Sequence, residues 1–315
     1  MKIVVADRSP FALKELLRSA VPPEHEIVTA DPGTGLLQAV HDADILLAAW
    51  FDVSREVIRR APRLHLIQTL GAGYDNVDVE AAREAGIKVA NTPGANASSV
   101  SEYTVMALLL LVKRFPEAEG ATRRGEWPQN EFMRTGVGEL DGLRVGLLGF
   151  GAIGRATARR LRVFGSEVRY FSRHRSSADI EEETGAAYLP KDELLAWSEA
   201  LSLHLPLTPE TRLFMNEEAF SRMPMGSYIV NTGRGDLIDE EALRRAVESG
   251  RIRGAVLDVL QDEGKRPNPF CDLPQVLVTP HIAGPTPRSS QRIVRMGLEN
   301  ILRVLEGEEP RWVVS

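Results

Sequence analysis

The chain holds a single cysteine, Cys271, among its 315 residues. It therefore cannot form an intramolecular disulfide or a two-cysteine metal motif, and we expect a metal-free protein of a reducing, cytoplasmic compartment. Long apolar runs are also missing, because the most apolar stretch, residues 105–112, is too short to span a bilayer. The first residues, MKIVVAD, have no long apolar stretch after Lys2 and are expected to form a strand rather than a signal peptide.

A surplus of positive charge is missing as well. Lys and Arg number 38 against 44 Asp and Glu, so the formal net charge is −6. Proteins that bind the phosphate backbone need basic residues, and we therefore expect no nucleic-acid partner. The hydrophobic fraction of 43% is typical of a globular chain with a core, and the length suits two domains.

The first half alternates short apolar runs with helical patterns. The runs expected to form strands are residues 3–6, 27–30, 45–50, 64–70 and 88–91. Continuous apolar strands separated by helices predict a parallel sheet that is covered on both faces. This half is therefore expected to form a flavodoxin-like domain.

A long buried helix is expected next. It would begin at an S-x-x-E capping box formed by Ser99 and Glu102 and end at Pro116. Residues 116–142 contain several Gly and Pro and are expected to be an irregular connection.

The second half repeats the alternation of strands and helices. Six strands are expected, at residues 144–148, 167–171, 200–204, 228–231, 254–259 and 276–279. Six is the strand count of a Rossmann dinucleotide-binding sheet. The last helix, about residues 288–306, has no following strand and is expected to return to the first domain. The predicted class is α/β with two doubly wound parallel-sheet domains, a substrate domain of 1–98 with 287–315 and a cofactor domain of 99–286.

A glycine-rich loop, GFGAIG, opens the second half. Gly149 permits a tight turn, Gly151 lets the backbone approach a diphosphate, and Gly154 lets helix and strand pack closely. The diphosphate would lie at the helix N-terminus, where free N–H groups favour an anion. Taken alone, the pattern is also compatible with an ordinary turn.

The end of the next strand predicts the cofactor type. NAD-binding sheets carry an Asp or Glu about 20 residues on, which binds the ribose 2′-hydroxyl. Here Ser172 stands 172 − 154 = 18 residues past the last glycine, followed by Arg173 and Arg175. These groups suit a 2′-phosphate, so we expect NADP(H) to be preferred, with NAD(H) still possible. The alternative is that both arginines are merely solvated.

Three strand ends in the second half carry polar groups suited to redox chemistry. They are NTGRGD with Arg234, DVLQDE with Asp258 and Glu263, and TPHIAG with His281. Reduction of a ketone leaves negative charge on oxygen, and histidine is the proton donor best suited to neutral pH. We therefore expect His281 to be the acid, Glu263 its orienting partner, and Arg234 the anchor for a substrate carboxylate.

The first half offers a second anion site. The segment LGAGYDNVD follows a strand, and its glycines can expose N–H groups to a substrate carboxylate at Ala72 and Gly73. Leu70 belongs to the same loop, and Trp50 at another strand end is expected to line the same site. An ordinary turn is the alternative.

Taken together, these motifs resemble the D-isomer-specific 2-hydroxyacid dehydrogenases over nearly the whole chain. The resemblance is carried by GFGAIG, NTGRGDLID, LDV-x₃-E, TPHIAG, LGAGYDNVD, NTPGANASSVSEYT and HLPLTPET. It implies a homodimer formed through the cofactor domains, D-specificity, and a catalytic Arg234, Glu263 and His281. It also implies the cofactor contacts Thr104, Gly149, Gly151, Ala152, Ile153, Gly154, Leu205, Pro206, Thr211, Thr232, Gly233, Asp258, His281 and Gly284.

The function expected from these residues is reduction of a small 2-oxo acid to a 2-hydroxy acid, with glyoxylate and hydroxypyruvate as leading candidates. A phosphoglycerate or phosphite dehydrogenase is an alternative that needs further positive charge in the pocket. Formate dehydrogenase is disfavoured, because that branch has glutamine where this chain has Glu263. A cofactor-sensing, protein-binding dimer of the corepressor type is the alternative from another class.

Overall fold

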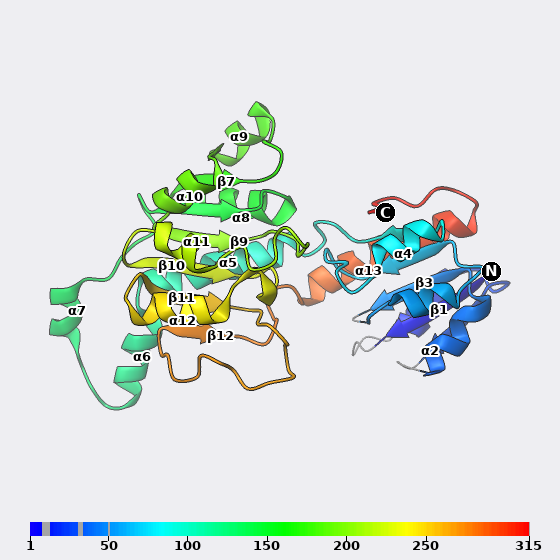
Figure 1. Ribbon diagram of the computed structural model, residues 1–315, viewed down its shortest axis with the longest axis horizontal. Coiled ribbons are helices and arrows are strands. Elements are labelled where there is room, and N and C mark those ends of the chain that lie inside the picture. Colours follow the sequence, from blue (N-terminus) through cyan, green and yellow to red (C-terminus); the bar gives the residue numbers. More distant parts are fainter. Residues whose placement is uncertain (8–12, 31–33, 50, 315) are drawn as a thin grey trace. The chain divides into compact units, whose positions relative to one another are not determined.

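The chain folds into two compact units in the computed structural model, which describes residues 1–7, 13–30, 34–49 and 51–314. One unit comprises Met1–Asn96 with Thr286–Ser315, and the other comprises Ala97–Pro285. Each unit is built on one sheet, and all strand pairings within both sheets are parallel (Figure 1). The predicted α/β class with two parallel sheets is therefore confirmed.

The first unit has a five-stranded sheet in the order β2-β1-β3-β4-β5. This is the flavodoxin-like order. Neighbouring residues of β1 point to opposite faces: Ile3 and Val5 belong to one buried cluster, and Val4 and Ala6 to another. Both faces are therefore covered, as the continuous apolar runs predicted. The strands are β1 Lys2–Asp7, β2 Glu26–Ala30, β3 Ile45–Ala49, β4 Leu66–Thr69 and β5 Lys88–Ala90, and the helices are α1 Leu13–Ala20, α2 Thr34–Ala39, α3 Arg55–Arg59 and α4 Val79–Glu84.

The last helix, α13 (Pro287–Leu305), packs on this first sheet. A capping box of Thr286 and Ser289 starts it. Inside the unit, Asn300 donates to the Oε1 atom of Gln68 on β4 at 2.8 Å and accepts from the N–H of Arg311 at 2.7 Å. A fully buried amide pair of this kind fixes one arrangement, because each unmade hydrogen bond would leave a buried polar atom unsatisfied.

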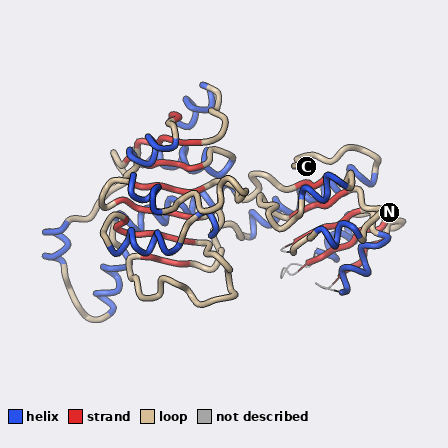
Figure 2. Tube along the Cα trace, viewed as in Figure 1, coloured by secondary structure: helices blue, strands red, loops and turns tan. Residues whose placement is uncertain are grey.

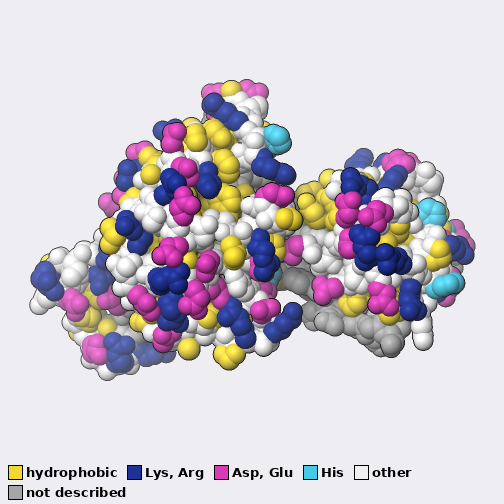
Figure 3. All heavy atoms as spheres, in the orientation of Figure 1, with side chains coloured by type: hydrophobic (Ala, Val, Ile, Leu, Met, Phe, Trp, Pro, Cys, Tyr) yellow, Lys and Arg dark blue, Asp and Glu magenta, His cyan; other side chains and the backbone are white. Residues whose placement is uncertain are grey.

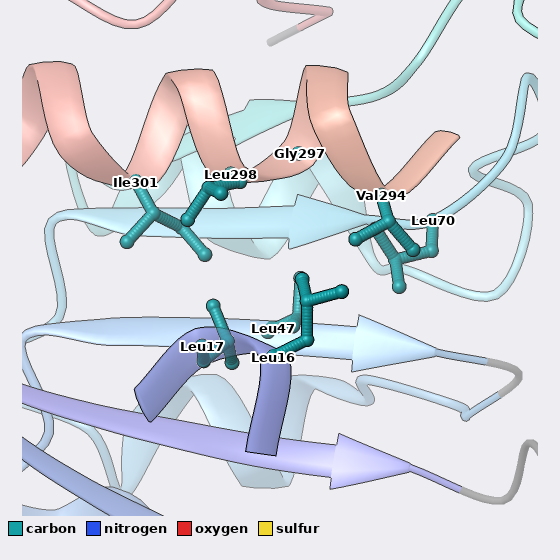
Figure 4. Close-up of a pocket in the computed structure, with 8 residues that line it drawn as sticks. All are labelled: Leu16, Leu17, Leu47, Leu70, Val294, Gly297, Leu298 and Ile301. Atoms are coloured by element: carbon teal, nitrogen blue, oxygen red, sulfur yellow. The ribbon is translucent and has the colours of Figure 1, made fainter. Parts of the chain in front are cut away.

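A small apolar cavity lies beside α13 in the first unit (Figure 4). Leu70, expected to contact substrate, lines it, and the β-carbon of an alanine at Gly297 would meet the Leu70 Cδ2 atom at 2.8 Å. Because the lining side chains are apolar, the cavity suits close helix packing rather than binding of a carboxylate. It is lined by Leu16, Leu17, Leu47, Leu70, Val294, Gly297, Leu298 and Ile301.

The second unit has a seven-stranded sheet in the order β12-β11-β10-β9-β6-β7-β8. The run from β8 to β11 has the Rossmann strand order, with β12 added beyond β11. The prediction of six strands is wrong by one, because β8 (Ala186–Tyr188) is a three-residue edge strand too short to give an alternating pattern. The other strands are β6 Arg144–Leu148, β7 Glu167–Phe171, β9 Ala200–Leu203, β10 Ser227–Asn231, β11 Ile252–Leu257 and β12 Val276–Val278.

Helices cover this sheet, and they include α8 (Ala152–Val163) directly after the glycine-rich loop. The others between β7 and β11 are α9 Ala178–Thr184, α10 Lys191–Trp197, α11 Glu217–Arg222 and α12 Glu240–Glu248. The long segment between β11 and β12 contains neither helix nor strand (Figure 2).

The long helix α5 (Ala97–Val112) differs from its prediction at both ends. It begins before Ser99, so Ser99 lies inside its first turn and does not cap it. Pro116 does not end α5, because Arg114 in the left-handed region already separates α5 from a new helix, α6 (Phe115–Arg123). Proline is favoured in the first turn of a helix, where its missing N–H has no partner to lose.

The segment expected to be an irregular connection therefore holds two helices, α6 and α7 (Gln129–Thr135). The prediction failed here because α7 buries none of its residues, so no apolar periodicity marks it. Among the described helices, none combines the length and the apolar character that crossing a membrane requires.

Candidate functional site

The candidate site is built at the carboxyl edge of the second unit's sheet. Strands β10, β11 and β12 are neighbours, and their register pairs Asn231 with Leu257 and Leu257 with Val278. The residues that follow these strands therefore emerge at the same edge, which is where ligands bind in open α/β sheets. Arg234, Asp258 and His281 all come from these three strand ends.

His281 and Glu263 are in direct contact. The Nδ1 atom of His281 lies 2.8 Å from the Oε2 atom of Glu263, and both side chains are partly exposed. A carboxylate can only accept, so the ring nitrogen that faces Glu263, Nδ1, carries a hydrogen. The structure therefore brings together the two residues that the sequence analysis paired, from positions 18 residues apart in the chain.

Asp258 is almost fully buried and holds the backbone next to His281. Its carboxylate accepts the N–H groups of Ile282 and Ala283, both at 2.8 Å, and its backbone oxygen accepts the N–H of His281 at 2.9 Å. His281 itself adopts a left-handed φ of 55°. Asp258 therefore shapes the turn that presents the imidazole.

Arg234 sits on a turn fixed by Asn231. The Asn231 side chain donates to the backbone oxygen of Arg234 at 2.9 Å and accepts the N–H of Gly233 at 3.0 Å. The Arg234 guanidinium donates to the backbone oxygen of Gly233 at 2.8 Å. The Oγ1 atom of Thr232 is buried and has no hydrogen-bond partner among the described residues, so it is available to a ligand.

Two residues that the sequence analysis did not single out hold the loop with Glu263. The β-carbon of an alanine at Gly235 would lie 1.9 Å from the backbone of Leu260, so the two segments touch without space for a side chain. Glu240, largely buried, accepts the N–H of Gln261 at 2.8 Å and pairs with Arg266. No motif signals these contacts, because they join residues that are close only after folding.

The glycine-rich loop fits a diphosphate. A β-carbon at Gly149 would lie 2.6 Å from the His204 backbone oxygen, and one at Gly154 would lie 2.4 Å from the Gly149 oxygen. No atom of the described residues lies within 4 Å of the corresponding point at Gly151, where α8 begins without a side-chain cap. Gly149 and Gly154 pack closely against neighbouring backbone, whereas the space at Gly151 is open. The N–H groups of Ala152 and Ile153 are therefore available to an anion.

The groups after β7 differ in their partners. Arg175 makes a bidentate ion pair with Glu181, at 2.9 and 2.8 Å, and Tyr170 donates to the same carboxylate. The Ser172 hydroxyl donates to the His174 backbone oxygen at 2.6 Å. Arg173 is exposed and makes no ion pair with a described residue. Of the two predicted arginines, Arg173 is thus the one without a direct ion pair among the described residues, although its charge acts on the nearby carboxyl of Glu210.

The remaining predicted cofactor residues occupy three places in the second unit. Leu205, Pro206 and Thr211 follow β9, and the Thr211 hydroxyl donates to the Pro206 oxygen at 2.7 Å. Thr104 is fully buried on α5 and donates to the Val100 oxygen at 2.9 Å within the helix. Gly284 follows the Asp258-bound turn.

The predicted substrate loop lies in the first unit. Asn91 donates to the Ala72 oxygen at 2.7 Å, and Thr92 accepts the N–H of Gly71 at 3.0 Å. Gly73 follows in the same turn, while Trp50 lies outside the described residues. The described residues contain no group of three or more His, Cys, Asp or Glu that could hold a metal ion.

His204, at the end of β9, has a strongly perturbed pKa. Its Nδ1 atom is buried and has no hydrogen-bond partner among the residues that the structure describes, and its Nε2 atom lies 3.1 Å from the Ser202 hydroxyl. Burial lowers the pKa of His204 to about 4. The ring is therefore neutral in the folded protein at pH values where an unfolded histidine takes up a proton.

The pH dependence of stability follows from this shift. Since the folded pKa is below the unfolded value, stability is present above about pH 6.5 and is lost as the pH falls toward 4. By linkage, the loss at pH 5 is about 2 kcal/mol. We expect urea unfolding to show that His204→Gln loses about 2 kcal/mol less than wild type between pH 7.5 and pH 5. His41→Gln, at an exposed histidine, is the control, and equal pH dependence of wild type and His204→Gln would contradict the prediction.

Comparison with known proteins identifies the family of this chain. The family model described as "D-isomer specific 2-hydroxyacid dehydrogenase, NAD binding domain" matches residues 105–283. A glyoxylate reductase of Thermofilum pendens is 38% identical over 89% of this chain and 84% of its own length. A D-3-phosphoglycerate dehydrogenase of Methanocaldococcus jannaschii is 36% identical over 93% of this chain and 55% of its own. The crystal structure of a glyoxylate reductase from Paecilomyes thermophila superposes with a TM-score of 0.88 at 31% identity, covering 100% of this chain and 98% of that one.

Proposed function

Because the chain belongs to the D-isomer-specific 2-hydroxyacid dehydrogenase family, we propose that it reduces small 2-oxo acids with NADPH, glyoxylate and hydroxypyruvate foremost. Membership makes the protein an oxidoreductase acting on the CH–OH group of its donors with a nicotinamide dinucleotide. The proposal is carried by one observation, the 2.8 Å contact of His281 with Glu263 at the carboxyl edge of a dinucleotide-binding sheet.

A reduced nicotinamide dinucleotide supplies the hydride when it is bound. The glycine-rich loop would hold its diphosphate, and Thr232, Gly233 and Asp258 would lie toward its nicotinamide end. Leu205, Pro206, Thr211 and Thr104 are the further residues proposed to contact it. The uncapped start of α8 and the unpartnered Thr232 hydroxyl support this assignment.

The protein's own residues handle the substrate and the proton. Arg234 would pair with the substrate carboxylate and carbonyl oxygen. In the first unit, the N–H groups of Ala72 and Gly73 are the groups proposed to bind a carboxylate. Glu263 fixes the imidazole of His281 through Nδ1, and Nε2 delivers the proton to the carbonyl oxygen. In the reverse direction, the same Nε2 atom takes the proton from the hydroxyl group. The guanidinium also stabilises negative charge that develops on the oxygen.

His281→Ala is expected to lower kcat by about 10²–10⁴-fold, because the proton donor is removed, while NADPH binding stays intact. Steady-state turnover of glyoxylate measures the first effect, and nucleotide fluorescence measures the second. His65→Ala, at an exposed histidine of the first unit, is the matched control. Full activity of His281→Ala would contradict the assignment of His281 as the proton donor.

The preference for NADPH is supported by the groups after β7. Ser172 stands where an acid would repel a 2′-phosphate, and Arg173 is exposed beside it. Arg175 would contribute less, because Glu181 already neutralises it.

We expect kcat/KM to be at least about tenfold higher with NADPH than with NADH. Arg173→Ala is expected to remove most of that ratio by weakening NADPH use alone, because only NADPH carries the phosphate. Arg159→Ala, which breaks an exposed ion pair on α8, is the control. A wild-type preference for NADH contradicts the proposal.

A panel of substrates distinguishes the alternative functions. A phosphoglycerate dehydrogenase would oxidise 3-phosphoglycerate in preference to reducing glyoxylate, and a phosphite dehydrogenase would oxidise phosphite. A corepressor-type dimer would bind the nucleotide without comparable turnover of any 2-oxo acid. Cationic and anionic side chains are interspersed on the face shown in Figure 3, which favours a small anionic substrate over a large polyanion. The single Cys271 fits a cytoplasmic enzyme.

We also propose a homodimer that pairs through the α6–α7 segment of the second unit. Figure 1 shows α7 standing away from the sheet of its unit. The segment exposes large apolar side chains, with Trp127 at 79% and Met133 at 75%. Apolar groups gathered on one projecting segment are typical of a protein interface.

Trp127→Lys is expected to convert the dimer to a monomer in light scattering after gel filtration, because a charge in an apolar interface is costly. Val163→Lys, at a residue that is 86% exposed on α8, is the matched control and should stay dimeric. A wild-type protein that is monomeric at micromolar concentration would refute the dimer.

A further inference from the structure

We propose that Tyr103 and Thr279 are positioning residues for the proton transfer at His281, and that they act through the buried carboxylate of Asp258. The proposal rests on the proposed function, since it concerns the same reaction. All four residues belong to the second unit.

The turn at His281 needs support. A left-handed φ of 55° costs about 1 kcal/mol or more for a residue with a β-carbon. The support comes from Asp258, whose backbone oxygen accepts the N–H of His281 and whose carboxylate accepts the next two N–H groups. The turn therefore keeps its shape only while this carboxylate stays in place.

The carboxylate of Asp258 is fixed in turn by a directed pair of hydroxyl groups. The Thr279 hydroxyl donates to its Oδ1 atom at 2.6 Å. A hydroxyl has one hydrogen, so Thr279 has none left for Tyr103. The 2.5 Å contact between Tyr103 and Thr279 must then be a donation from the phenol of Tyr103. Burial raises the pKa of Tyr103, so the phenol keeps this hydrogen across the neutral range.

Helix α5 holds the other end of the same segment. The Ser99 hydroxyl, buried one helical turn before Tyr103, donates to the backbone oxygen of Ala283 at 2.7 Å. Residues four apart lie on one face of a helix. A single face of α5 therefore binds residues 279 and 283, with His281 between them.

The expected consequence of losing the Tyr103 hydroxyl is misplacement of the Nε2 atom rather than its removal. Thr279 would lose its donor, and the carboxylate below the turn would be held less firmly. Proton transfer depends steeply on geometry, whereas the substrate carboxylate is held elsewhere, by Arg234. We therefore expect a loss in kcat with little change in KM.

Tyr103→Phe tests this directly. We expect kcat for glyoxylate to fall about tenfold and KM to stay within about twofold. Tyr228→Phe is the matched control, because Tyr228 is equally buried in the same apolar cluster and its hydroxyl makes no hydrogen bond to a described residue. Unchanged kcat in Tyr103→Phe overturns the proposal.

The relay itself is tested at Thr279. Thr279→Val removes the hydroxyl at nearly constant volume, and Thr279→Ser keeps it, so serine should recover most of the activity that valine loses. The double variant Tyr103→Phe/Thr279→Val should lose no more activity than the less active of the two single variants, because both substitutions break the same chain of hydrogen bonds. Losses that multiply would show that the two hydroxyls act independently, which overturns the relay.

A readout without substrate separates this proposal from the proposed function. In protein labelled with ¹³C,¹⁵N-histidine, the ring signal of His281, assigned through His281→Asn, should shift or broaden in Tyr103→Phe and not in Tyr228→Phe. An unchanged signal overturns the positioning role, whatever the kinetics. If no 2-oxo acid is turned over, the proposed function fails, and the NMR comparison still decides whether Tyr103 orders the turn.

Discussion

The site depends on one buried carboxylate. Asp258 is 1% exposed, and no cation among the described residues pairs with it. Burial of an unpaired ion costs several kcal/mol unless hydrogen bonds replace the lost water. Here the replacements are a hydroxyl and two backbone N–H groups, and all three belong to the segment that carries His281. The need to satisfy one charge therefore dictates the path of the chain around the imidazole.

Glu263, the partner of His281, is held in place by contacts other than those of Asp258. Glu263 lies on a long segment without regular structure, which by itself would leave its position open. The start of that segment is pressed against Gly235 and is bound by Glu240. Gly235 directly follows Arg234, so the contact that locates Glu263 also fixes the arginine's turn. Three groups with different origins in the sequence are thereby tied to one edge of the sheet.

What the sequence predicts well is local. Apolar runs identified both sheets, and the glycine-rich loop was found because its spacing has a local steric cause, visible in the close approach of Gly154 to Gly149. What it misses depends on partners. Ser99 and Glu102 satisfied a capping pattern, yet Ser99 bonds to Ala283, far along the chain. Tyr103 lies in a helix that is apolar on nearly all sides, where nothing marks its hydroxyl as different from a core side chain.

The charged groups after β7 show the same limit of prediction from sequence. Arg173 and Arg175 are the same residue type, so a count of charges in the sequence gives the loop two cations. In the folded unit, Glu181 on α9 binds Arg175 bidentately, and Tyr170 fixes that carboxylate from β7. A bidentate pair already uses the face of the guanidinium that would bind a phosphate. The electrostatic attraction available to an incoming anion therefore comes chiefly from Arg173, a distinction that only the position of Glu181 creates.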